Sequence, residues 1–303
     1  SIIIFFIILF YKIDIVHARS RAPAWSCLWA CFFSRKKFVT TFHGTYNFSS
    51  KLKHFYNSVM VRSKLVIAGS NFIFNHINEN YQKYLNPSKN KLMVIFRGIN
   101  LEYFNSNNVT EKKVNFLAKD WNINKNDFII LLPGRLTRWK GQEMFIEALS
   151  LFNENSSKNN FHAIILGSDQ GRSIYSKKLL LLVERYRLNK KITFIKNCKE
   201  MPVAYKLANV AISSSIEPEA FGRVAIEAQA MNKPIVASNL GGSKETVLNG
   251  KSGLLFKAED VKELAEIINK LINTDNESLG LMGEHGRKNV EKKFNVDQMC
   301  QTT

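Results

Sequence analysis

From about residue 128 onward, two kinds of apolar pattern alternate along this 303-residue chain. Short apolar runs bounded by turn residues predict strands at residues 128–132, 162–166, 191–195, 210–213 and 234–237. Helical spacing of the apolar positions predicts helices at residues 142–152, 173–187, 201–208, 224–231 and 258–273. Apolar strands that alternate with amphipathic helices indicate a parallel sheet covered on both faces. We therefore expect a doubly wound α/β domain.

The first part of the chain shows the same alternation more weakly. Apolar runs predict strands at residues 13–18, 37–42, 64–68 and 92–96. Residues 105–110 are polar, rich in asparagine and without periodicity, which is typical of a linker or surface loop. We expect two facing α/β domains, over residues 1–112 and 113–280, and a helical tail over residues 281–303. Ligands of such sheets bind beside the carboxyl ends of the strands, so a cleft between the domains is the expected site.

Residues 2–10 form an unbroken apolar run. The run is too short to span a bilayer, and it lacks the basic leading region of a signal peptide. We interpret it as a buried helix. The alternative interpretation is a segment that associates with a membrane.

Composition adds one unusual property. A hydrophobic content of 45% and a charged content of 22% are those of an ordinary globular protein, but the formal net charge is +18. Such a charge favours polyanionic partners, namely nucleic acid, anionic lipid headgroups or phosphorylated substrates. No pattern of a nucleic-acid-binding module is present, so nucleic acid is not expected. The four cysteines form neither a C-x-x-C pair nor a plausible disulfide framework, which favours a cytoplasmic location.

Two carboxylates lie eight positions apart, at Glu219 and Glu227. Pro218 and Gly222 punctuate the segment, so the first carboxylate is expected on a loop and the second inside the helix that follows. The N-terminus of that helix offers backbone N–H groups and the positive end of the macrodipole, which suit a phosphate or diphosphate. The alternative interpretation is that Glu219 caps the helix and that Glu227 is a solvated surface residue.

The segment that follows supports a ligand site. Residues 233–245 are typical of a buried strand that ends in a turn with paired glycines, Gly241 and Gly242. Together with Glu219 and Glu227, this segment resembles the donor-site signature of the retaining glycosyltransferases of family 4. That signature is an E-x7-E motif followed by a strand and a Gly-Gly-x-x-Glu turn.

A basic loop follows the first strand of the second domain. Arg135 and Lys140 lie there, at the carboxyl edge of the predicted sheet. A guanidinium and a nearby ammonium are suited to neutralising a diphosphate and the charge that develops on it as a leaving group. The alternative interpretation is a solvated basic loop. The loop resembles the G-R-x-x-x-x-K-G donor-phosphate loop of the same family.

Candidate residues in the first domain also follow predicted strands. His43 and Gly44 come after one of them, and the glycine lets a ligand approach the backbone closely. His17 and Arg19 end the strand before it, in a D-[IV]-V-H opening that resembles the family. The alternative interpretation for His17, Arg19 and His43 is a structural role. The turn at Ser70 resembles the family's strand-Ser turn.

Residues 97–100 depart from the family pattern. Arg97 stands where the N-G-[IV]-D segment usually has asparagine, and Asn100 stands where it has aspartate.

The resemblance implies a GT-B fold, with two facing doubly wound Rossmann-like domains, the first incomplete because the family's opening strand and Gly-rich turn do not precede residue 13. It implies sugar transfer from a nucleotide diphosphate sugar with retention of configuration, without a metal or a cofactor. His43 and Glu219 would be the catalytic residues, contacting the sugar. The implied donor-binding residues are Arg135, Lys140, Phe221, Gly222, Glu227, Gly241 and Gly242, with Glu227 on the ribose. The implied acceptor-side residues are His17, Arg19, Gly44 and Ser70.

The partners expected from this interpretation are the nucleotide sugar and a saccharide or lipid-linked acceptor, with lipopolysaccharide or another cell-envelope glycan as the acceptor class. The basic stretch at residues 50–64 predicts either a helix on an anionic membrane surface or a helix with its apolar face in the core. A cytoplasmic protein, peripheral on the inner face of a membrane, fits these expectations. The alternatives are a non-catalytic fragment that binds nucleotide sugar, and a basic protein that binds membranes or nucleic acid.

We expect Lys140→Ala to lower turnover by orders of magnitude with little change in thermal stability.

Overall fold

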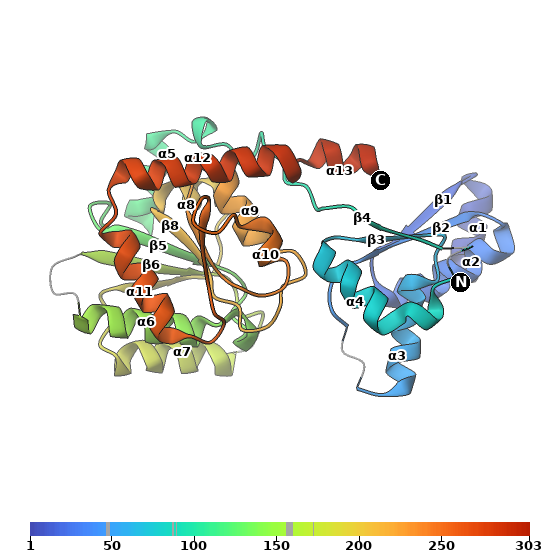
Figure 1. Cartoon of the computed structure of the whole chain (residues 1–303), viewed down its shortest axis with the longest axis horizontal. Coiled ribbons are helices and arrows are strands. Elements are labelled where there is room, and N and C mark those ends of the chain that lie inside the picture. The colour runs from blue at the N-terminus through green and yellow to red at the C-terminus, as the bar shows by residue number, and fades with distance from the viewer. Residues whose placement is uncertain (47–48, 87, 89, 156–159, 172) are drawn as a thin grey trace. The chain divides into compact units, whose positions relative to one another are not determined.

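The computed structural model describes residues 1–46, 49–86, 88, 90–155, 160–171 and 173–303. The chain forms two compact units (Figure 1). The first unit contains residues 1–97 and 299–303, and the second contains residues 98–298. The sequence placed the boundary later, at about residue 112, and it set residues 281–303 apart as a tail.

The first unit is built on a four-stranded parallel sheet with the order β1-β2-β3-β4. Its strands are β1 (Ile15–Ala18), β2 (Lys37–Phe42), β3 (Leu65–Ala68) and β4 (Lys91–Val94), and its helices are α1 (Ile2–Phe10), α2 (Arg21–Ser34), α3 (Lys51–Asn57) and α4 (Asn71–Tyr81), with the short 3-10 helices η1 (Ser58–Val61) and η2 (Gln82–Tyr84). All four predicted strands are present, with ends that differ by a few residues. The carboxyl ends of the parallel strands share one edge of this sheet.

The helix over residues 2–10 is present, but its expected burial is wrong. Only Ile8 is buried in α1, while Ile3 and Phe10 are 76% and 81% exposed. The helix is apolar all round, so the single face that packs inward leaves the other apolar side chains in contact with solvent. Among the residues that the structure describes, no helix combines the length and the apolar composition needed to cross a bilayer.

The second unit is built on a six-stranded parallel sheet with the order β10-β9-β8-β5-β6-β7. Its strands are β5 (Phe128–Pro133), β6 (Phe161–Leu166), β7 (Ile192–Ile195), β8 (Val210–Ser213), β9 (Ile235–Ser238) and β10 (Gly253–Phe256). Its helices are α5 (Glu111–Asp120), α6 (Gln142–Asn155), α7 (Ser173–Arg185), α8 (Met201–Leu207), α9 (Arg223–Ala230), α10 (Ser243–Thr246), α11 (Val261–Ile272), α12 (Asn276–Lys293) and α13 (Val296–Thr302). The last of these helices begins in the second unit, and its residues from Met299 onward are assigned to the first unit. The second unit also contains the 3-10 helices η3 (Ser106–Asn108) and η4 (Arg138–Lys140).

Helices cover both faces of this second sheet, as the alternating pattern predicts. In Figure 1, α6, α7 and α11 lie on one face, and α5, α8, α9 and α12 lie on the other. The strands β5, β6 and β8 are almost fully buried between the layers. The strand β10, which the pattern did not predict, pairs with β9 and forms one edge of the sheet. The doubly wound prediction is confirmed.

The segment at residues 98–110 belongs to the second unit and is not a free linker. The Lys206 ammonium donates to the backbone oxygens of Ser106 and Val109, at 3.1 and 2.8 Å. Arg287 of α12 donates through Nη1 to the oxygens of Phe104 and Ala230, at 2.6 and 2.7 Å. These bonds satisfy carbonyl groups of an irregular segment, which would otherwise need water or another partner.

A glycine at the end of η4 allows two loops of the second unit to meet. Gly141 has φ +69°, and a Cβ atom added there would lie 1.9 Å from the backbone oxygen of Ser214. The Ser214 hydroxyl in turn donates to the oxygens of Lys140 and Gly141, at 3.1 and 3.2 Å. The loop after β5 is thereby held directly against the loop after β8.

We expect Gly141→Ala to destabilise the protein by at least about 2 kcal/mol, because left-handed backbone is costly for alanine and the methyl group meets backbone atoms. Urea unfolding measures the loss. Gly280→Ala is the matched control, since Gly280 lies inside α12 with open space around it, and we expect that change to be neutral or to stabilise by about 0.5–1 kcal/mol. Equal effects of the two changes would contradict the close contact.

Candidate functional site

The strand order predicts a crevice beside the loops that follow β5 and β8. The chain runs from β5 to β6 and β7 on one side, and then returns to pair β8 with the other side of β5. At such a switch point, where the strand order reverses, the loops leave neighbouring strands in opposite directions and a crevice is expected at the carboxyl ends of the strands. Arg135 and Lys140 lie after β5, and Glu219 lies after β8. The structure therefore brings these predicted residues to one edge of the second unit.

An ion pair joins the two loops. The Lys140 Nζ atom lies 2.7 Å from Glu219 Oε1, and the two side chains are only 13% and 10% exposed. The hydroxyls of Ser213 and Ser215 donate to the same oxygen, at 3.2 and 2.6 Å. Burial raises the pKa of Glu219, but the Lys140 charge and these hydrogen bonds outweigh burial and hold the pKa below its ordinary value. Glu219 is therefore an ionised acceptor whose Oε2 atom remains available for other donors.

The paired glycines position the Glu219 loop. The Gly242 N–H donates to the Glu219 backbone oxygen at 2.8 Å. A Cβ atom on Gly241 would lie 2.4 Å from that same oxygen, and one on Gly242 would lie 2.5 Å from the Phe221 Cα atom. Only glycine permits this approach, so the turn after β9 packs directly on the loop after β8.

The helix α9 begins where the punctuation of the sequence predicts. Gly222 is its N-cap residue with φ +82°, and Phe221 is buried against Phe294 at 5.5 Å between ring centres. The first N–H groups of a helix have no partner within the helix, so they can bind an anion. Because Gly222 occupies the N-cap position, the alternative that Glu219 caps this helix is wrong.

Glu227 lies in α9 and is largely buried, so the alternative of a solvated surface residue is also wrong. Its Oε2 atom accepts from the Tyr205 hydroxyl at 3.0 Å, and its Oε1 atom accepts from Arg223 at 2.9 Å. Burial raises the pKa of Glu227, and the Arg223 charge and the Tyr205 hydrogen bond offset only part of that rise. The carboxylate is thus fixed in orientation by two donors.

Arg135 is exposed and makes no ion pair within the described residues. Its backbone oxygen accepts from the Gln142 side chain at 2.8 Å, which fixes the loop while leaving the guanidinium in solvent. The Lys140 Nζ atom and the Arg135 guanidinium carbon lie 4.4 and 6.0 Å from the centre of the Trp139 ring. The two predicted cations therefore flank one aromatic ring on the β5 loop.

In the first unit, four basic side chains gather at the carboxyl edge of the sheet. Arg97 Nη2 lies 2.8 Å from His43 Nδ1, and Arg19 Nε lies 3.2 Å from His43 Nε2. His17 Nε2 lies 2.7 Å from the Thr41 hydroxyl. The sequence marked Arg97 only as a departure from the family pattern, and its contact with His43 was not expected.

The surroundings of His43 decide its protonation state. Burial and the charges of Arg97, Arg19 and His17 lower the pKa of His43 to about 4. His43 is therefore neutral at physiological pH and has one N–H donor and one acceptor nitrogen. It can hydrogen-bond a ligand, but it is not the protonated imidazolium that acid catalysis would require.

The other two predicted residues of the first unit differ in surroundings. Ser70 is fully buried and caps α4 by accepting from the Ile73 N–H at 3.2 Å, which gives its hydroxyl a structural role. Gly44 has no described atom within 4 Å of an added Cβ, so open space lies beside His43.

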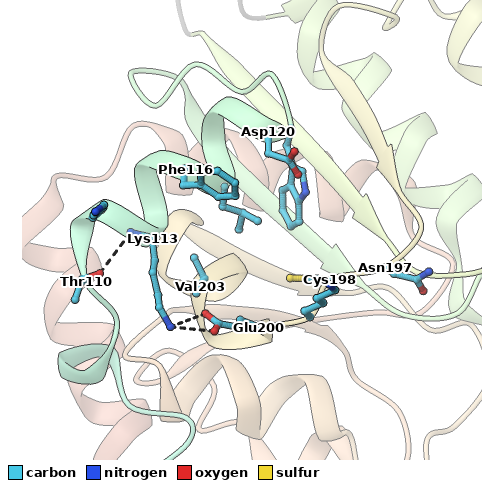
Figure 2. A pocket seen from close by; sticks show the side chains of 12 residues that line it. Thr110, Lys113, Phe116, Asp120, Asn197, Cys198, Glu200 and Val203 are labelled. Carbon is cyan, nitrogen blue, oxygen red and sulfur yellow. Dashed lines mark hydrogen bonds and ion pairs between the residues drawn. The ribbon is translucent and has the colours of Figure 1, made fainter.

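A pocket of about 710 Å³ lies elsewhere in the second unit, between α5 and the segment that joins β7 to α8 (Figure 2). Phe116, Cys198 and Val203 are among its mostly apolar walls. Lys113 lies at one side and is neutralised by Glu200 at 2.8 Å. None of the predicted donor residues lines the pocket. The exposed Arg135 guanidinium and the N-terminus of α9 at the switch point are better suited to a diphosphate.

Models of two families match most of the chain. Residues 113–289 match the glycosyl transferases group 1 model, and residues 4–103 match the glycosyltransferase family 4 model. The chain belongs to the group 1 glycosyltransferases.

A capsular polysaccharide biosynthesis glycosyltransferase, CapM, from Staphylococcus aureus is 32% identical over 68% of this chain and 52% of its own length. A D-inositol 3-phosphate glycosyltransferase from Corynebacterium urealyticum is 28% identical over 68% of this chain and 47% of its own length. The matched regions thus span about half of these two relatives.

Solved structures confirm the fold of this group 1 glycosyltransferase chain. A glycosyltransferase from Rickettsia africae superposes with a TM-score of 0.89, at 36% identity, over 99% of this chain and 77% of that one. Anabaena HepE, solved in complex with UDP and glucose, superposes with a TM-score of 0.84, at 24% identity, over 95% of this chain and 76% of its own. The two parallel sheets are those of the GT-B fold.

No group of three or more His, Cys, Asp or Glu side chains within the described part of the chain is arranged to hold a metal ion.

The Lys140–Glu219 pair changes the expected effect of Lys140→Ala on stability. Removing the ammonium leaves a mostly buried carboxylate without its cation, so we expect a loss of about 3 kcal/mol in the free energy of unfolding. Chemical denaturation measures it. Lys178→Ala is the control, because Lys178 pairs with Glu143 from an exposed position, and that change should cost less than about 0.5 kcal/mol. A Lys140 variant as stable as the control would show that the pair is not formed.

The two glutamates should contribute to stability with opposite pH dependence. Because the folded pKa of Glu219 is below its ordinary value, its contribution is present above pH about 4.5 and disappears as the pH falls through the folded pKa. Because the folded pKa of Glu227 is raised, the contribution of its protonated form is present below pH about 4.5 and is lost as the pH rises through the folded pKa.

Unfolding curves at several pH values test this contrast. The stability difference between the wild type and Glu219→Gln should shrink on acidification, whereas the difference for Glu227→Gln should change in the opposite direction. If acidification changed both stability differences in the same direction, the environments assigned to Glu219 and Glu227 would be contradicted.

Proposed function

We propose that this chain carries the donor site of a retaining glycosyltransferase, which moves a sugar from a nucleotide diphosphate sugar to an acceptor. The observation that carries the proposal is the combination of Lys140, Glu219 and the N-terminus of α9 at the switch point of the second sheet. A diphosphate needs cations and N–H donors, and a sugar needs a fixed carboxylate acceptor. This edge of the sheet supplies both.

Each group has a role in this proposal. Arg135 and Lys140 neutralise the diphosphate and stabilise it as a leaving group, together with the first N–H groups of α9. Glu219 accepts from donor-sugar hydroxyls through Oε2 and holds the anomeric carbon in position. Glu227, already oriented by Tyr205 and Arg223, accepts from the ribose hydroxyls. Gly241 and Gly242 contribute by shaping the loop.

The first unit would supply the sugar-contact and acceptor side of the reaction. Neutral His43 offers a hydrogen bond to the sugar, and the open space beside Gly44 leaves room for a ligand. His17 and Arg19 would meet the acceptor. A role for Ser70 there would be indirect, since its hydroxyl caps α4.

The relatives support a cell-envelope acceptor. CapM takes part in capsular polysaccharide biosynthesis, and HepE was solved with UDP and glucose. A saccharide or lipid-linked acceptor, including lipopolysaccharide, follows from that likeness and from the net charge of +18. The same charge supports a cytoplasmic protein that is peripheral on the inner face of a membrane. Basic and aromatic side chains of α3, such as Lys51, Lys53 and Phe55, are exposed and suit such a surface.

A second candidate function is donor binding without transfer. The chain spans 52% and 47% of the two curated relatives described above, so it matches only part of a known transferase. Titration with nucleotide sugars, run beside a transfer assay, separates the two functions. Binding with transfer supports the enzyme, and binding alone supports the second candidate.

Two glutamate variants test the donor site. We expect Glu219→Ala to weaken UDP-glucose binding by about 10-fold or more relative to its effect on UDP binding, because of the two ligands only UDP-glucose offers a sugar to the carboxylate. Glu227→Ala should weaken both ligands to a similar degree, because the ribose is common to them. Isothermal titration calorimetry measures both affinities.

Lys178→Ala serves as the control for nonspecific loss of affinity, since neither Lys178 nor its partner Glu143 is among the proposed ligand-binding residues. The donor assignment fails if both glutamate variants bind UDP and UDP-glucose as the wild type does. GDP-mannose and ADP-glucose should be titrated in parallel, so that a wild type selective for another base is recognised.

A further inference from the structure

The positive charge of the protein is concentrated in the first unit. Residues 1–97 contain 14 lysines and arginines and only two acidic residues, Asp14 and Glu79. This stretch therefore carries +12 of the total +18. Within the described part of the chain, neither of these two acids forms an ion pair or hydrogen bond with the arginines and histidines at the carboxyl edge of the sheet. Asp14 precedes β1 and pairs with Lys36 at 2.9 Å, and Glu79 lies in α4, where its charge acts on His76.

The basic groups at that edge converge on one imidazole ring. The guanidinium groups of Arg97 and Arg19 approach the two ring nitrogens of His43, at 2.8 and 3.2 Å. A neutral imidazole has only one acceptor nitrogen, so it can accept from only one of them at a time. The shorter contact assigns that bond to Arg97, which leaves Arg19, an exposed side chain, free to turn to another acceptor.

An anion beside these like charges would lower their mutual repulsion. Two guanidinium groups beside one neutral ring repel each other, and a negative charge placed between them is attracted to both. A guanidinium fork matches the oxygens of a phosphate in geometry as well as charge. Arg97 also passes over Gly69, where an added Cβ would lie 3.6 Å from its Cγ atom, at the turn that leads into α4. The positive end of that 11-residue helix therefore adds to the same field.

We propose that Arg19 and Arg97, with His17 and His43 beside them, bind a phosphate ester carried by the acceptor. Assigning the phosphate to the acceptor rests on the proposed function, because the donor diphosphate is assigned to Arg135 and Lys140. A phosphate suits the cluster better than a carboxylate, since it offers more oxygens and up to two negative charges to two forks. In this proposal, Arg97, which replaces the usual asparagine of the family pattern, helps to determine which acceptor binds.

Direct binding to the whole chain tests this proposal without a transfer assay. The histidine ring signals of the 15N-labelled protein are followed by NMR during titration with methyl phosphate, and His43 and His17 are assigned by substitution. We expect a saturable shift of both rings. Arg19→Gln and Arg97→Asn should each weaken the affinity by about 10-fold or more, because each removes a charge-assisted hydrogen bond.

Lys53→Gln is the matched control, since it removes one exposed positive charge from the same unit outside the cluster. It should change the affinity less than about 2-fold, as expected for a screened distant charge. If Arg97→Asn fails to fold, as judged by circular dichroism, Arg97→Lys replaces it. That variant keeps the charge but loses the fork, so it should also bind methyl phosphate more weakly than the wild type.

The proposal is overturned if neither histidine ring shows a saturable shift, or if Lys53→Gln weakens binding as much as the arginine variants do.

Dimethyl phosphate is the second probe. Preference for the monoester indicates a soluble sugar phosphate, and preference for the diester indicates a lipid-linked phosphate. UDP-glucose titration of Arg97→Asn keeps the two proposals apart. Loss of methyl phosphate binding with intact UDP-glucose binding identifies the acceptor cluster, whereas a wild type that binds methyl phosphate but no nucleotide sugar refutes the donor assignment alone.

Discussion

The ion pair between Lys140 and Glu219 is the interaction on which the arrangement of the second unit's ligand edge depends. It links loops that follow adjacent strands and would otherwise diverge. A mostly buried pair is tolerated only when its remaining hydrogen-bonding capacity is satisfied, and the two serines beside Glu219 provide for this. The glycine contacts described above bring the backbones close enough for the pair to form. The loop geometry and the electrostatics are therefore one constraint.

The two units handle charge in different ways. The second unit pairs its site cation with a carboxylate and holds that carboxylate ionised by three donors. The first unit gathers guanidinium groups around a neutral histidine, with few acids anywhere in its sequence. The pair in the second unit keeps a cation beside an ionised carboxylate, whereas the cluster in the first unit concentrates positive charge. The proposed transfer from a diphosphate donor to a phosphorylated acceptor would use both arrangements.

Much of the fold follows from local pattern, because buried parallel strands are apolar throughout and their covering helices are amphipathic. That is why β5, β6 and β8 were predicted closely. The strand β10 was missed because Gly253 begins a short segment without a clear period. The helix α12 was expected only as part of a helical tail over residues 281–303, and its start at Asn276 was missed because Gly280, Gly283 and Gly286 lower its helical propensity. The motif spacing identified Glu219 and Glu227, but not their opposite pKa shifts. Those depend on Lys140 and Tyr205, which come from distant parts of the chain. The Arg97 contact with His43 likewise needs tertiary structure.

The hydrogen bonds of Arg287 bear on how this protein can be divided for study. One side chain in α12 holds backbone oxygens from Phe104 and Ala230, and Lys206 holds two more from residues 106 and 109. A recombinant fragment that starts at residue 113 would remove both backbone partners of Lys206 and the Phe104 partner of Arg287, while Arg287 would keep Ala230 and Glu291. Beginning at Gly98 keeps these hydrogen bonds, so the useful start of an isolated second unit lies upstream of where the family-model match begins.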